Sequence, residues 1–90
     1  MTSARARDDA VDITLSKAEA LILFEWLSRN WEANKWEVGG LFADPAERQL
    51  LIWLENDLEG VLDEVFDPNY KELVNASYGD VRSRFVEPME

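Results

Sequence analysis

Hydrophobic side chains recur at intervals of three and four residues in three parts of the chain, which is the spacing of an amphipathic helix. The pattern predicts helices over about residues 17–32, 45–66 and 68–86. Because the apolar positions of each helix fall along one side, the three helices can pack around a common core. The chain is therefore predicted to be all-α, as a three-helix bundle.

Local signals mark where each helix begins. Ser16 and Glu19 have the spacing of a capping box, in which each residue satisfies a backbone N–H of the first turn. The Asp-Pro pairs at 44–45 and 67–68 each place an N-cap residue before a proline in the first turn. The second pair also ends the preceding helix, because the residue before proline avoids the α conformation. Gly60 interrupts the middle helix at a cost of about 1 kcal/mol relative to Ala.

Each predicted helix carries one apolar stripe that is expected to face the core. In the first helix the stripe consists of Ala20, Leu23, Phe24, Leu27 and Trp31. In the second it consists of Leu50, Leu51, Leu54, Leu58, Val61, Leu62 and Val65. In the third it consists of Tyr70, Leu73, Val74, Val81 and Phe85.

The remaining segments are predicted from their composition. Residues 1–10 are expected to be a disordered arm, and residues 11–90 a single helical domain. A short extended segment is predicted where apolar residues alternate, at Val11, Ile13 and Leu15, but it is too short to build a sheet on. The loop 34–44 is expected to fold back over the core through its large apolar residues, Trp36, Val38, Leu41 and Phe42.

Composition excludes several classes of protein. The apolar fraction of 47% is too high for a disordered chain, and the absence of Cys and His removes the thiol nucleophile, the usual base at neutral pH and the commonest transition-metal ligands. A net charge of −10 excludes direct binding to nucleic acid phosphates. The sequence shows neither an apolar run that could cross a membrane nor a secretory signal. We expect a cytoplasmic protein that is not an enzyme and holds no metal or cofactor.

Acidic residues are concentrated in the middle helix. Between Arg48 and Lys71 there are six acids and no base. Glu55, Glu59 and Asp63 are spaced to form one ridge, and two further acids, Asp57 and Glu64, fall on another flank. Both sets avoid the predicted core side. They form either a solvated face that maintains solubility or a docking surface for a positively charged partner.

The same acids nearly match a calcium-binding loop. Counted from Glu55, the residues Asp57 and Glu59 fall on ligand positions, and Gly60 falls on the turn position. The final position, which requires a bidentate carboxylate, is Phe66. The helical period explains these residues better, so no calcium site is predicted.

Two of the helices carry a second, smaller apolar patch centred on a tryptophan. Ile22 and Trp26 lie opposite the main stripe of the first helix, and Ile52 and Trp53 lie opposite that of the second. The patches are either covered by the third helix and the loop around Trp36, or exposed at a homodimer or partner interface. Trp53 with Asp57 and Glu64 offers a seat for a Lys or Arg side chain.

Three segments of the chain, "DITLSKAEALILFEWL", "DPAERQLLIWLENDLE" and "VFDPNYKELV", resemble a group of small acidic bacterial proteins of unassigned function. The similarity spans roughly residues 11–75 and consists of helix caps and core positions. The resemblance implies a helical fold, and it transfers no function.

Two functions are consistent with these features. The first is a small acidic protein-protein interaction module that neutralises a basic partner, as immunity proteins and antitoxins do. The alternative is a homo-oligomeric scaffold or accessory subunit in which the tryptophan patches of two copies bury each other. The residues expected to contact a partner are Trp53, Asp57, Glu64, Glu55, Glu59, Asp63, Trp26 and Ile22.

Overall fold

The computed structural model describes residues 2–37 and 39–85. Its elements, in chain order, are the strands β1 (Ser3–Arg7) and β2 (Ala10–Thr14), the helices α1 (Lys17–Asn34) and α2 (Pro45–Val61), the short 3-10 helix η1 (Asp63–Phe66) and the helix α3 (Tyr70–Phe85). The presence of the three predicted helices is confirmed, although α2 ends earlier than predicted and α3 begins two residues later. The last residue of the third predicted helix, Val86, and the loop residue Val38 lie outside the described residues, as do Met1 and residues 87–90.

The N-terminal segment differs from the prediction, because residues 3–14 form an antiparallel hairpin where a disordered arm was expected over 1–10. Ser3 pairs with Thr14 and Arg7 with Ala10, leaving a two-residue loop. Asp8 in this loop has a positive φ of 40°, a conformation that Asp tolerates better than most residues. The fold is therefore helical with a small two-stranded sheet, and not purely all-α.

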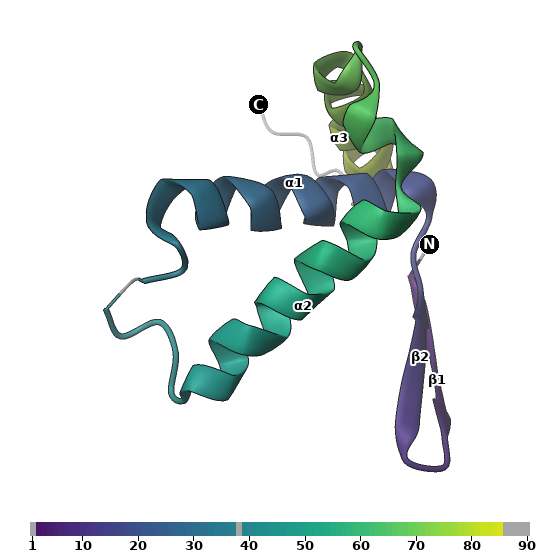
Figure 1. Ribbon diagram of the computed structural model, residues 1–90. Helices are drawn as coiled ribbons and strands as arrows, with labels where there is room; N and C mark the ends of the chain where they lie inside the picture. Colours follow the sequence, from purple (N-terminus) through teal and green to yellow (C-terminus); the bar gives the residue numbers. More distant parts are fainter. Residues whose placement is uncertain (1, 38, 86–90) are drawn as a thin grey trace.

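The helices are arranged around α1, since α2 and α3 both pack against it. The 3-10 helix η1 contacts α2 and α3 and carries the chain from one to the other. Figure 1 shows α2 meeting α1 near η1 and then diverging from it, so that the two helices form a V. One long side of α2 is therefore left without a helix packed on it.

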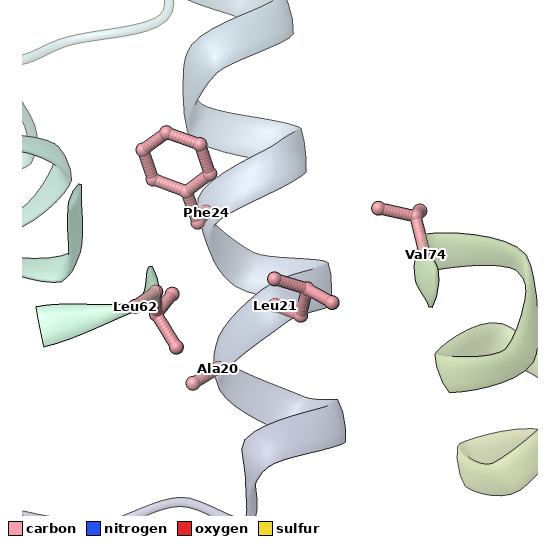
Figure 2. Close-up of a cluster of buried hydrophobic side chains, with 5 residues drawn as sticks. All are labelled: Ala20, Leu21, Phe24, Leu62 and Val74. Carbon is pink, nitrogen blue, oxygen red and sulfur yellow. The ribbon is translucent and has the colours of Figure 1, made fainter. Parts of the chain in front are cut away.

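The main core lies where the three helices meet. Figure 2 shows Ala20, Leu21 and Phe24 of α1 between Leu62 on one side and Val74 of α3 on the other. Leu27 and Trp36 are also buried. The predicted stripe of α1 is confirmed at Ala20, Phe24 and Leu27. In α3 the prediction is confirmed at Val74 and is wrong at Phe85, which is 66% exposed at the last position of the helix.

The predicted start signals act as expected at α1 and α2. The Ser16 hydroxyl accepts a hydrogen bond from the Glu19 amide at 3.1 Å, and the Ser16 amide donates to the Glu19 carboxylate at 2.7 Å, which completes the capping box. The Asp44 carboxylate accepts from the Ala46 amide at 2.8 Å. Asp67 likewise accepts from the Asn69 amide, and α3 then begins at Tyr70.

The middle helix is shorter than predicted. It ends at Val61, and Leu62 has the extended angles φ −106° and ψ 97° before η1 begins. This break turns the Leu62 side chain into the core, where only 3% of its surface is exposed. The expectation of one continuous helix over 45–66 is wrong, because the chain leaves the α conformation at Leu62 and continues as the 3-10 helix η1.

The open end of the V is closed by the loop that follows α1. Lys35 and Trp36 both have positive φ, 54° and 60°, and reverse the chain. The Arg48 side chain donates to the carbonyl of Lys35 at 2.9 Å and lies over the Trp31 ring at 5.5 Å. The buried ring of Trp36 contacts Phe42 of the same loop with their centroids 6.0 Å apart. The prediction that this loop folds back over the core is confirmed at Trp36.

Candidate protein-binding surface

α2 packs on α1 by one side only, and none of its residues is fully buried. Leu51 and Leu58 are half-buried toward α1. On the flank turned to solvent, Leu50, Trp53 and Val61 are 60%, 59% and 69% exposed. Asp57, which is also exposed, lies one turn from both Trp53 and Val61. We call Leu50, Trp53, Asp57 and Val61 the outer face of α2.

The outer face corrects the predicted orientation of α2. Leu50 and Val61 were assigned to the core stripe, yet both are exposed. A helix in which apolar residues occupy more than half the circumference cannot bury all of them against one neighbour. The width of this apolar arc is the sequence signal that indicates an outer face in addition to the core stripe.

Asp57 lies between the apolar side chains of Trp53 and Val61 on α2. Within residues 2–37 and 39–85, no ion pair or hydrogen bond engages its side chain. A carboxylate one helical turn from an exposed indole provides the two groups that hold a Lys or Arg side chain, namely a negative charge and an aromatic face. This part of the predicted site, Trp53 with Asp57, is brought together by the structure.

The predicted acidic ridge is interrupted. Glu55 is half-buried on the side of α2 that faces α1, whereas Glu59 is exposed and Asp63 belongs to η1. Burial raises the pKa of the Glu55 carboxyl, and the negative charges of Glu59 and Glu32 raise it further. The expectation that all three acids form one outward ridge is wrong, because α2 is rotated to bring Glu55 toward α1 and ends before Asp63.

Glu64 is likewise separated from Trp53. Its carboxylate accepts a hydrogen bond from the Lys17 ammonium at 3.0 Å, which joins η1 to the start of α1. That hydrogen bond lowers the pKa of Glu64, with the positive charge of Lys17 adding to the effect. Glu64 therefore has an intramolecular role, and the predicted grouping of Glu64 with Trp53 is wrong because η1 turns it toward α1.

The second tryptophan patch has a different environment. The ring of Trp26 lies 5.1 Å, centroid to centroid, from that of Trp36, so part of Trp26 is covered by the loop after α1. A shallow apolar depression is lined by Ile22, Leu23 and Trp26 of α1 and by Val81 of α3. Cover by neighbouring elements, one of the two predicted alternatives, accounts for the part of the Trp26 side chain that is not exposed. It does not explain Trp53, which makes no ring contact with another described residue.

Among residues 2–37 and 39–85, no group of three or more acidic side chains is placed to hold a metal ion. None of the helices in this part of the chain combines the length and apolarity needed to cross a membrane.

No protein-family model, curated protein or solved structure matches the chain. This agrees with the expectation that the resemblance described above leads to no named family with an assigned function.

Proposed function

We propose that the protein binds a basic protein partner through the outer face of α2. The observation that carries this proposal is a row of three large, exposed apolar side chains with an unpaired carboxylate among them. Exposed apolar groups gathered in one place are typical of interaction sites, and tryptophan is enriched among the residues that contribute most to binding.

The charge of the protein supports a positively charged partner. The net charge is −10, and the segment between Arg48 and Lys71 contains acids without a base. Such a field speeds the encounter with a basic surface and weakens as salt screens it. Self-association through the same face is disfavoured, because a two-fold contact centred on it would bring the Asp57 side chains of two copies together.

The partner surface can be described by its chemistry. A Lys or Arg side chain over the Trp53 ring would also reach the Asp57 carboxylate. Apolar side chains on either side would cover Leu50 and Val61, which lie toward the two ends of the row. In this proposal the protein is a cytoplasmic interaction module that neutralises its partner by covering a basic surface, as immunity proteins and antitoxins do, and it performs no catalytic step.

The test is capture of partners from the native host lysate with two matched double variants. The first, Trp53→Ala with Asp57→Lys, removes the indole and reverses the charge on the outer face. The control, Phe85→Ala with Glu72→Lys, makes the same changes in exposed residues of α3. The two variants therefore have equal net charge and a similar loss of exposed aromatic surface.

We expect wild type and the α3 control to capture the same basic protein, and the outer-face variant to lose it. Capture by the wild type should also weaken as the salt concentration rises. Equal loss in both variants would show that only overall charge matters. Retention in both would show that the outer face of α2 is not the binding surface.

A further inference from the structure

The outer face of α2 is a narrow, straight row. Its four residues are separated by three, four and four positions, so at 100° per residue they fall within an arc of about 80°. The row is about 16 Å long at ~1.5 Å per residue. Two exposed polar side chains, Gln49 and Asn56, border it along one side. The apolar strip therefore has the width that a single helix can cover.

The backbone chemistry of the site favours a helix as the covering element. The N–H and C=O groups of α2 are hydrogen-bonded within the helix, so they offer nothing to a strand or loop laid along the row. Such a segment would lose water from its own peptide groups without gaining partners for them, whereas a strand added to a sheet edge is paired at once. A helix carries its backbone hydrogen bonds within itself. The face of a sheet does too, but it is wider than the strip and would press on Gln49 and Asn56.

The relief of the outer face also suits a helix. Trp53, Asp57 and Val61 are four residues apart and form one ridge, and Leu50 and Leu54 belong to the next ridge. Leu54 is half-buried, so the groove between the two ridges has an apolar floor. Helices pack by laying a ridge of one into a groove of the other. The Asp57 carboxylate stands at the middle of this groove, where a Lys or Arg of the entering ridge can reach it.

The charges of α2 set the direction of the entering helix. Its last turn contains no basic residue, and the exposed acids Glu59 and Asp63 lie at that end. The dipole of α2 adds further negative charge there. At the other end, the charge of Glu47 in the first turn is balanced by Arg48 beside it. An antiparallel helix places the positive, N-terminal end of its own dipole beside the negative end of α2, and a parallel helix would place its negative end there.

We propose that the partner presents a basic amphipathic helix to the outer face, antiparallel to α2. A Lys or Arg near the middle of this helix lies between Trp53 and Asp57, and apolar residues about one turn away on either side cover Leu50 and Val61. Resting on the function proposed above, this assignment adds the secondary structure and the direction of the segment that is bound.

The first test maps the bound segment by photo-crosslinking. The photoreactive residue p-benzoylphenylalanine is placed at position 50, 53 or 61, one at a time, and the crosslinked residues are identified by mass spectrometry after irradiation in the native host lysate. The three native side chains are mostly exposed, so the larger ring is accommodated without repacking the interior. A matched control carries the same residue at position 85, where Phe85 is exposed at the end of α3.

We expect the three outer-face positions to crosslink to one segment of one protein, and the control at position 85 to leave that segment untouched. A helix along the row is crosslinked over about 11 residues, because both helices rise by ~1.5 Å per residue. An extended segment covers the same length in about five residues. In the antiparallel arrangement, the numbers of the crosslinked partner residues fall as the probe moves from position 50 to position 61.

The possible results separate this inference from the function on which it rests. Crosslinks confined to about five residues, or scattered over several segments, overturn the helix, and rising residue numbers overturn its direction. In each of these cases the outer face is still the binding surface. The absence of crosslinks from all three positions overturns the proposed function and the helix together.

The second test concerns the central basic residue. In the captured partner, replacing that Lys or Arg by Gln should weaken binding to the wild-type protein by roughly tenfold, because it removes both the ring contact and the ion pair. The same replacement should have a several-fold smaller effect on binding to the Asp57→Asn variant, in which the ion pair is already absent. Equal losses against the two proteins would overturn the placement of the basic residue beside Asp57.

Discussion

Two leucines of the middle segment, Leu62 and Leu50, provide a direct test of how α2 is oriented. Both belong to the apolar stripe predicted from the sequence, yet Leu62 is 3% exposed and Leu50 is 60% exposed. Replacement by Ala removes three carbon atoms, each contributing about 0.8 kcal/mol when fully buried. For Leu62 this gives a loss of about 2.4 kcal/mol, to which a cavity adds, so that about 3 kcal/mol is expected in total. For Leu50 the loss is at most about 1 kcal/mol, because most of the side chain is already in water.

The measurement is urea unfolding of both variants and the wild type, followed by circular dichroism at the helix band. A domain of this size has a total stability of about 5–13 kcal/mol, so the Leu62→Ala loss is a large fraction of it. Its thermal midpoint should fall by roughly 15 °C, and that of Leu50→Ala by only a few degrees. Equal losses in the two variants would refute the orientation of α2 and, with it, the outer face.

Three further predictions concern single groups. Glu55→Gln should stabilise the protein by a few tenths of a kcal/mol at neutral pH, since burial and neighbouring acids raise the pKa of Glu55 and penalise its charged form. This gain should disappear as the pH falls below about 4.3, where the wild-type side chain is neutral in the folded and unfolded states alike; a gain that persists there would contradict the assignment. Ser16→Ala should cost about 1 kcal/mol in urea unfolding, because α1 loses one half of its capping box; no loss would mean that the cap is dispensable. Burial, together with the 2.7 Å hydrogen bond to Glu25, raises the pKa of the Tyr70 phenol. In an ultraviolet titration one of the two tyrosines should therefore ionise well above the usual pKa of about 10, and Tyr70→Phe should remove that late component.

The sequence predicted the helices well, because their starts are encoded by local chemistry. Ser16 and Asp44 form the caps that their positions indicated, and the break before Pro68 follows from the geometry of proline. The hairpin escaped prediction for a local reason. Its first strand alternates Ala with Arg, a weak strand signal, and its loop is Asp-Asp in place of the glycine-containing pairs that usually identify such turns.

The candidate surface was predicted only in part. Trp53 and Asp57 lie together as expected, because their spacing along one helix determines their proximity. Leu50 and Val61 were assigned to the interior, since periodicity shows which residues share a side but not which side a neighbour covers. Glu64 was misplaced because its direction depends on the 3-10 turn, which no local signal in the sequence indicated.

The absence of fully buried residues in α2 has a consequence for how such a protein changes over time. Residues on its solvent side can be exchanged with little effect on the packing of α1 and α3, because the shared interior is closed by Leu62 from beyond the end of the helix. If the outer face is the binding surface, as we propose, binding and folding depend on different parts of the chain, and related proteins could acquire new binding preferences on this helix while retaining the same architecture.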